Sequence, residues 1–392
     1  MKIAYINADP GVPVFGTTGC SVHVQEVLLA MLQRGDEVHV FTTRIGEEAP
    51  PDITALEIHP LPKVPRADAA TRERAALATN DAIREALLRE TSKGGFDLVY
   101  ERYSLWSCAG MDFAFEQNIP SILEVNEPLI EEHASHHLLI NRSAAEDVAM
   151  RAFRAATVIT AVSRQLAHVL EQHPSARGKV HVVPNAVNTE RFGSARPALS
   201  NNGGFVIGFV GTLRAWQGIT TLIEGFTQVA AHSTNARLLI VGDGPEREHL
   251  DREIAARNLV SRVRFTSAVL PEAVPGLLAS MDVAVAPYPA LAHFYLSPLK
   301  IYEYMAAGLP IVASRIGQVE EVIDHGKTGF LIPPGDSAEL AKLLCRLELD
   351  PDLRMRVGDA AKAAVQEHTW ANLLTYVLSL AGTPATVNTP AI

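Results

Sequence analysis

The feature that most constrains the fold is an alternation of short apolar runs, rich in β-branched residues, with amphipathic helical patterns. The first series opens with a strand-like run at 3–7, a Gly-rich loop and a helical pattern from about Ser21 that Gly35 closes. Strands that alternate with helices predict a parallel sheet covered by helices on both faces. The further strand-like runs of this series lie at 37–43, 98–101, 121–125, 157–162 and 180–183, with one long helix expected at 131–156.

A second series of the same kind follows a polar stretch at 188–204 that is rich in Pro, Gly, Ser and Asn. The chain of 392 residues is longer than one hydrophobic core normally supports. We therefore expect two domains, each doubly wound. The expected boundaries are a first domain at 1–190, a linker at 191–204, a second domain at 205–365, a helix at 366–382 that crosses back to the first domain, and a flexible tail at 383–392.

Composition excludes several classes of partner. A formal net charge of −10, without a run of Lys or Arg, argues against nucleic acid as the main ligand. No stretch reaches the roughly 18 apolar residues of a membrane span, and no signal peptide is visible, although a peripheral contact with a membrane surface stays open. Three widely separated cysteines fit a reducing compartment, so a cytoplasmic location is expected.

One segment of the second series, at 297–308, has the features of a ligand-binding helix start. Ser297 reads as the N-cap of a helix, Pro298 as its first residue and Gly308 as its stop. Lys300 and Glu303 are three residues apart and share a face near the unpaired amides of the helix start, which suits a phosphorylated, sugar-like ligand. The alternative is a solvated surface pair. The first loop, 11–19, lacks the G-x-G-x-x-G pattern, which disfavours a nicotinamide dehydrogenase.

Several motifs, in this order, resemble the large retaining glycosyltransferase family 4. In the second half they are Val-Gly-Thr-Leu-Arg-Ala-Trp-Gln-Gly at 210–218, Val-Gly-Asp-Gly-Pro-Glu at 241–246, and the segment at 297–314 with 317–334 behind it. Four segments of the first half also resemble segments of this family: the loop at 16–19, Glu-Arg-Tyr at 101–103, Leu-Glu-Val-Asn at 123–126 and Val-Pro-Asn-Ala-Val at 183–187. The resemblance spans 1 to about 380 and implies the α/β fold called GT-B, two doubly wound Rossmann-like domains that face each other across a cleft.

The resemblance also implies roles for particular residues. Glu303 would accept hydrogen bonds from the ribose diol of a nucleotide sugar, and Arg214 and Lys300 would act catalytically by stabilising the diphosphate leaving group. The other donor-binding residues would be Gly211, Thr212, Gly242, Pro245, Tyr295, Leu296, Ser297, Pro298 and Leu299. Residues expected to contact the acceptor or to line the cleft are Gly16, Gly19, Arg102, Asn126 and Asn185.

Three positions depart from the family pattern. The pattern has Arg where this chain has Thr212 and Lys where it has Gln217, so Arg214 and Lys300 would be a relocated guanidinium and a relocated ammonium. The second Glu of a paired-glutamate motif, which would hold the transferred sugar, is replaced by Tyr295. The sugar that the donor carries is therefore left open.

The resemblance implies a retaining transfer from a nucleotide-diphosphate sugar to an acceptor hydroxyl, with the leaving phosphate taking the acceptor proton. The base of the donor (uracil, guanine, adenine or thymine), the acceptor and the oligomeric state stay open. No cofactor and no metal are expected, since His133, His136 and His137 lack Cys or carboxylate partners in a recognisable pattern. The alternatives are a catalytically inactive glycosyltransferase-like subunit and a sugar-nucleotide 2-epimerase of the same fold.

Overall fold

The structure, a computed structural model, describes residues 1–136, 139–200 and 203–383. The chain divides into two compact units. The first contains residues 1–16, 20–184 and the C-terminal segment from Trp370, and the second contains residues 17–19 and 185–369. The division falls between Pro184 and Asn185, rather than after residue 190 as expected from the composition of the following stretch.

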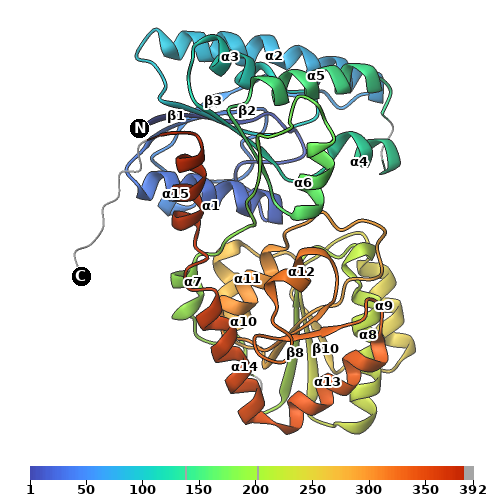
Figure 1. Ribbon diagram of the computed structural model, residues 1–392. Helices are drawn as coiled ribbons and strands as arrows, with labels where there is room; N and C mark the ends of the chain where they lie inside the picture. The colour runs from blue at the N-terminus through green and yellow to red at the C-terminus, as the bar shows by residue number, and fades with distance from the viewer. Residues whose placement is uncertain (137–138, 201–202, 384–392) are drawn as a thin grey trace, which may run out of the picture. The chain divides into compact units, whose positions relative to one another are not determined.

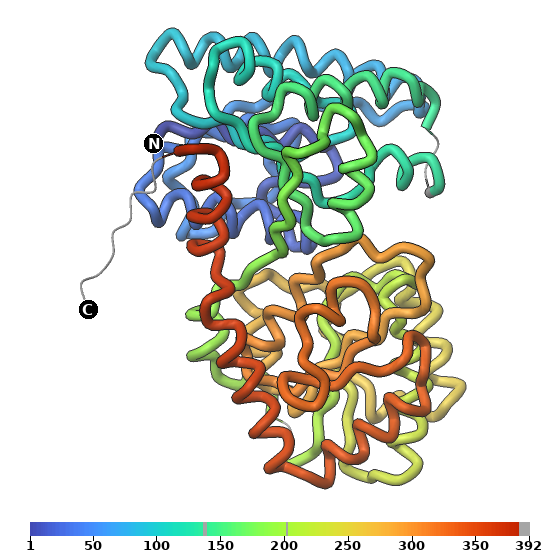
Figure 2. The backbone as a smooth tube through the Cα atoms, viewed as in Figure 1, coloured from blue at the N-terminus to red at the C-terminus, as the bar shows by residue number. Residues whose placement is uncertain are grey.

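The first unit is a parallel sheet of seven strands in the order β3-β2-β1-β4-β5-β6-β7. Helices α2, α3 and α5 lie on one face, and α1 and α15 on the other (Figure 1). Figure 2 shows the red α15 beside the blue N-terminal segments of this unit. The strands are β1 Lys2–Asn7, β2 Glu37–Thr42, β3 Glu57–Pro60, β4 Leu98–Arg102, β5 Ser121–Val125, β6 Val158–Ala161 and β7 Val180–Val182, and the α-helices are α1 Gly19–Gln33, α2 Ala69–Thr91, α3 Ala109–Glu116, α4 Leu129–His136, α5 Arg142–Ala155, α6 Arg164–Glu171 and α15 Trp370–Leu380.

The second unit is a parallel sheet of six strands in the order β10-β9-β8-β11-β12-β13. In both sheets the strand order reverses beside the first strand, and open α/β sheets bind ligands at the carboxyl ends of the strands at that point. The strands are β8 Phe205–Val210, β9 Ala236–Val241, β10 Val263–Phe265, β11 Val283–Ala286, β12 Ile311–Ser314 and β13 Phe330–Ile332, and the α-helices are α7 Thr189–Gly193, α8 Ile219–His232, α9 Arg247–Ala256, α10 Val274–Leu278, α11 Leu299–Ala306, α12 Gly317–Val322, α13 Ser337–Leu349 and α14 Pro351–Ala364.

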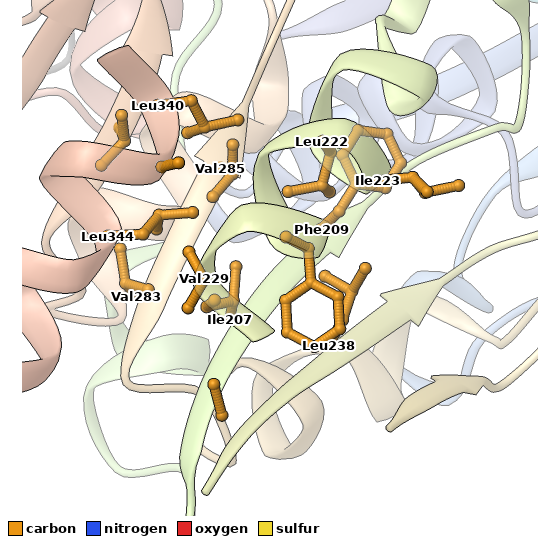
Figure 3. Packing of buried hydrophobic residues seen from close by; sticks show 14 of the residues in the cluster. Ile207, Phe209, Leu222, Ile223, Val229, Leu238, Val283, Val285, Leu340 and Leu344 are labelled. Carbon is orange, nitrogen blue, oxygen red and sulfur yellow. The ribbon is translucent and has the colours of Figure 1, made fainter. Parts of the chain in front are cut away.

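The two faces of the second sheet carry separate hydrophobic clusters. Alternate residues of β8, such as Ile207 and Phe209, pack under α8 and α13 with Leu222 and Leu340 (Figure 3). The opposite face is covered by α11, whose Ile301 and Tyr304 are buried against β11 and β12. Because both faces are apolar, the strands read as continuous apolar runs, which explains why the sequence indicated them clearly.

Two expectations for the first unit were wrong. The long helix expected at 131–156 is two helices, α4 and α5, and Asn141 begins the second as an N-cap whose side chain accepts from the Ala144 amide. The strand β3 was missed, because Glu-Ile-His-Pro is short, polar and ends in Pro, as edge strands often do. In the part of the chain that the structure describes, no helix has the length and apolar character needed to cross a bilayer.

Candidate functional site

Helix α11 is tied to the carboxyl end of β8 by two side chains. The Tyr304 hydroxyl accepts a hydrogen bond from the Val210 amide at 2.8 Å, and the Lys300 ammonium donates to Gln217 Oε1 at 2.6 Å. The Lys300 Nζ also lies 4.0 Å from the centroid of the Phe209 ring. The loop after β8 and the helix after β11 therefore meet at the point where the strand order of the second sheet reverses.

Lys300 is a cation held in an apolar setting. Burial lowers its pKa to about 7, although the nearby Glu303 carboxylate opposes that change. Gly211 makes room for it, since a Cβ there would stand 2.7 Å from the Lys300 Nζ. A buried amine whose pKa lies near neutrality, facing a glycine loop, is placed to gain a proton when an anion arrives.

The start of α11 differs from the expected cap. The helix begins at Leu299, after Pro298, and no side chain caps it. Ser297 is used elsewhere: its hydroxyl accepts from the Asn185 amide at 2.9 Å, and its carbonyl accepts from the Asn185 side chain at 2.5 Å. The Ile301 amide donates to the Pro298 carbonyl at 3.1 Å, whereas the two amides before it, those of Leu299 and Lys300, have no side-chain cap, which suits an anion. Asn185, expected at the acceptor, belongs to the second unit and fixes this turn.

Two glycine loops pass close together beside Lys300. The Gly211 amide donates to the Val241 carbonyl at 2.9 Å, so this amide serves the loop itself, and the Leu213 amide donates to the Asp243 carbonyl at 2.9 Å. A Cβ at Gly242 would lie 2.1 Å from the Gly211 carbonyl oxygen. The Gly-rich turns of the two motifs are therefore one packed unit at the carboxyl edge of the sheet.

We expect Gly242→Ala to destabilise the second unit by about 2 to 5 kcal/mol, from overpacking against backbone plus strain at a φ of +137°. Gly335→Ala is the matched control, because it has a φ of +78° but nothing within 4 Å of its Cβ. Chemical denaturation of both variants checks this. Equal losses in the two variants would contradict the close approach of the loops.

The other residues expected to bind the donor lie on helix α11 and on loops of the second unit. Glu303 lies one turn after Lys300 on α11 and is partly exposed. Tyr295 stacks on His293 with 5.4 Å between the ring centroids. Thr212 and Leu296 are partly buried, and Pro245 is exposed. Arg214 is exposed, and the hydrogen bonds described for it are made by its backbone, so the structure does not bring its side chain to Lys300.

In the first unit, a buried carboxylate organises the carboxyl edge of the sheet. Glu124 Oε1 accepts from Arg102 at 2.9 Å and from the Asn126 side-chain amide at 2.7 Å, and Oε2 accepts from the Tyr100 hydroxyl at 2.5 Å. His23 Nε2 lies 2.9 Å from Oε1. Burial raises the pKa of Glu124, but His23, Arg102 and Tyr100 outweigh it and hold the pKa well below its usual range.

This network joins two of the expected acceptor residues, Arg102 and Asn126. Neither Glu124 nor His23 was given a role from the sequence, although a Glu inside the apolar run Ser-Ile-Leu-Glu-Val was a signal that a buried charge needs partners. Gly16 lies in the loop after β1, where a Cβ would stand 2.9 Å from the Ser21 Oγ, and Gly19 begins α1.

Comparison with known proteins agrees with this architecture. The model of glycosyltransferase family 4 matches residues 17–191, and that of the group 1 glycosyl transferases matches residues 204–350. The chain is 29% identical over 240 residues to the 2-deoxystreptamine glucosyltransferase of Streptomyces kanamyceticus, covering 59% of this chain and 60% of the relative. It is 25% identical to the D-inositol 3-phosphate glycosyltransferase of Acidothermus cellulolyticus, covering 92% of this chain and 85% of the relative.

The chain spans only 39% to 60% of the length of the first relatives that it matches. Among solved structures, HepE of Anabaena in complex with UDP-glucose has a TM-score of 0.72 and 20% identity, covering 97% of this chain and 98% of that one. WaaG, a glycosyltransferase of lipopolysaccharide biosynthesis, has a TM-score of 0.73 at 16% identity, covering 97% of this chain and 100% of that one. These structures confirm the GT-B fold, and with both family models matched the chain belongs to the group 1 glycosyltransferases of family 4.

Proposed function

We propose that this protein transfers a glycosyl group from a nucleotide-diphosphate sugar to an acceptor hydroxyl, with retention of configuration. The observation that carries the proposal is the hydrogen bond between Lys300 and Gln217. Gln217 stands where the family pattern has Lys, and the Lys300 ammonium lies 2.6 Å from its side-chain oxygen. The missing charge is thus supplied from α11 to the same loop.

The diphosphate would bind between the first turn of α11 and the glycine loop after β8. The helix start contributes amides and the positive end of its dipole, and Lys300 contributes an ammonium within the same turn. Glu303 would accept hydrogen bonds from the two ribose hydroxyls, because its two oxygens match a vicinal diol. Tyr295 would contact the sugar as a neutral partner, and Arg214 would reach the diphosphate from the exposed edge of its loop.

In the transfer step, the bond between the anomeric carbon and the diphosphate oxygen breaks, and a bond from the acceptor oxygen forms on the same face. The acceptor proton passes to the leaving phosphate, so no enzyme nucleophile and no metal are invoked. This chain's contribution is the positioning of both substrates and the positive field of Lys300 and the helix start.

The acceptor would be bound by the first unit, where Glu124 holds Arg102 and Asn126 at the carboxyl edge of the sheet. The names of two relatives contain a cyclitol, 2-deoxystreptamine in one and inositol 3-phosphate in the other. Polyhydroxylated six-membered rings are therefore the first acceptors to test. We place the protein in the cytoplasm, in keeping with the absence of disulfides among its described cysteines.

Thermal unfolding in the presence of UDP-, GDP-, ADP- and dTDP-sugars tests the donor. A ligand at a hundred times its dissociation constant adds about 2.7 kcal/mol to the free energy of unfolding. We expect one base to raise the melting temperature well above the others, and we expect Glu303→Gln to weaken that shift. The absence of a shift with every donor would contradict the proposal.

Donor binding should also take up a proton. At pH 8 the Lys300 amine is mostly neutral in the free protein, since its pKa is about 7, and an adjacent diphosphate raises that pKa. We expect uptake of about one proton per donor at pH 8 and almost none at pH 5.5, where Lys300 is already charged. Calorimetry in buffers of different ionisation enthalpy measures this, with Lys300→Met as the control. A binding enthalpy independent of the buffer at pH 8 would contradict the role of Lys300.

A further inference from the structure

A cluster of histidines and carboxylates lies at the β3 edge of the first sheet. His39 lies in β2 and Glu57 and His59 lie in the edge strand β3, and the parallel register sets His39 beside Glu57 and Phe41 beside His59. Residues two apart in a strand share a face, so these side chains project to the same side of the sheet. The last turns of α2 bring Glu90 to that side, and one possible ligand atom from each of the four residues lies within 4.8 Å of the others.

The separations fit a single small cation. His39 Nδ1 lies 3.0 Å from His59 Nε2, and a Glu57 oxygen lies 3.8 Å from the same His59 nitrogen. Zinc binds imidazole nitrogen and carboxylate oxygen at about 2.0 to 2.2 Å, which places the ligand atoms of a tetrahedral site about 3.3 Å apart. Two nitrogens and two carboxylates are a donor set that zinc accepts.

The ring positions are fixed in advance. The Phe41 ring stacks on His59 with 4.5 Å between centroids, and the Phe96 ring meets His39 edge-on at 5.5 Å. His39 is almost fully buried, and its Nε2 lies 2.8 Å from a Glu37 oxygen. Imidazoles held by packing and by a carboxylate are typical of metal ligands that need little rearrangement on binding.

The close approach of the two imidazole nitrogens, His39 Nδ1 and His59 Nε2, needs a proton or a cation between them. A single proton can lie between His39 Nδ1 and His59 Nε2, and on its other side His59 presents Nδ1 to the Glu90 carboxylate at 3.9 Å. Lys93 lies 2.9 Å from Glu90, on the solvent side of the cluster. A divalent ion between the two imidazoles would replace the shared proton, and its charge would balance the carboxylates of Glu57 and Glu90.

We propose that His39, Glu57, His59 and Glu90 bind one divalent transition-metal ion of the zinc class, which fastens the edge strand β3 and the helix α2 to β2. The role is structural. The cluster lies on the edge strand β3, its neighbour β2 and α2, away from the point between β1 and β4 where the strand order reverses and where such sheets bind ligands. His133 of α4, considered from the sequence, is not one of these ligands, and the side chain of His136 and residue His137 lie outside what the structure describes.

The test uses full-length protein without a histidine tag, stripped with a chelator and titrated with ZnCl₂ or CoCl₂. We expect one equivalent to bind, Co²⁺ to show the intense visible absorption of a four-coordinate site, and Zn²⁺ to raise the melting temperature. His59→Gln and Glu57→Gln should each weaken binding at least about tenfold. His168→Gln, an exposed histidine of α6 in the same unit, should leave binding unchanged.

Two ligand variants are used because His59→Gln could disturb the fold. Glu57 is largely exposed, so Glu57→Gln leaves the packed rings of His39 and His59 in place. Failure to bind a stoichiometric ion would overturn the proposal and leave the cluster as a proton-linked hydrogen-bond network. Binding that is unchanged in both ligand variants would overturn it as well, since the ion would then sit elsewhere on the protein.

Discussion

Replacing Lys300 by Met should lower the rate of glycosyl transfer about 10²- to 10³-fold, which corresponds to about 2.7 to 4 kcal/mol of lost electrostatic stabilisation. Met fills the apolar space against Phe209 and beneath Gly211 without a charge, so the fold should persist. Steady-state kinetics with the donor identified by thermal unfolding measures the change. Lys327→Met is the matched control, because its ammonium is 73% exposed in a surface pair with Asp324.

A second variant tests whether the positive charge can act from position 217 as well as from position 300. Because Lys300 donates to Gln217, the double variant Lys300→Met, Gln217→Lys returns the ammonium to the position that the family pattern uses. We expect it to recover at least about tenfold of the lost rate. Nearly unchanged turnover in Lys300→Met alone would remove Lys300 from the catalytic residues.

Replacing Glu124 by Gln should cost about 3 to 5 kcal/mol of stability in the first unit, because it leaves the buried Arg102 guanidinium without its counter-charge. The effect should depend on pH. The pKa of Glu124 is lowered on folding from an ordinary 4.5, so its contribution is present above about pH 4.5 and is lost as the pH falls. The difference between wild type and variant should therefore narrow in acid.

Urea denaturation of wild type and variant between pH 3 and pH 7 measures this loss. Glu116→Gln, in an exposed pair with Arg84, is the control and should cost less than about 1 kcal/mol. A loss in Glu124→Gln no larger than in the control would mean that the network around Glu124 contributes little to stability. The same variant should loosen Arg102 and Asn126, which we propose contact the acceptor.

The central strands, such as β1, β8 and β11, were predictable because they are buried on both faces and therefore appear as apolar runs in the sequence. Edge strand β3 was not, since a polar strand of four residues is held by register with β2 and by its side-chain partners rather than by its own hydrophobicity. The break between α4 and α5 was missed for a related reason: both flanks keep helical periodicity, and the cap at Asn141 is local.

The placement of Lys300 and Glu303 on one helix was predictable, because a local motif fixes it. Contacts whose partners come from distant segments were not predictable. Sequence alone indicated that Thr212 and Gln217 lack the family's charges, but only the fold brings Lys300 to Gln217. Ser297 was expected to cap α11 and instead accepts from the Asn185 amide, a contact between residues 112 positions apart. The role expected for the side chain of Arg214 stays a prediction.

The most direct test of the proposed function is the product formed from the donor that binds, incubated with a panel of cyclitol and sugar acceptors and no added divalent metal. We predict release of the nucleoside diphosphate together with a new glycosidic bond that keeps the donor's anomeric configuration, as read by NMR. Donor binding without turnover would instead indicate an inactive glycosyltransferase-like subunit. Nucleotide release with a 2-epimerised free sugar would indicate an epimerase, and an inverted product would contradict the retaining mechanism.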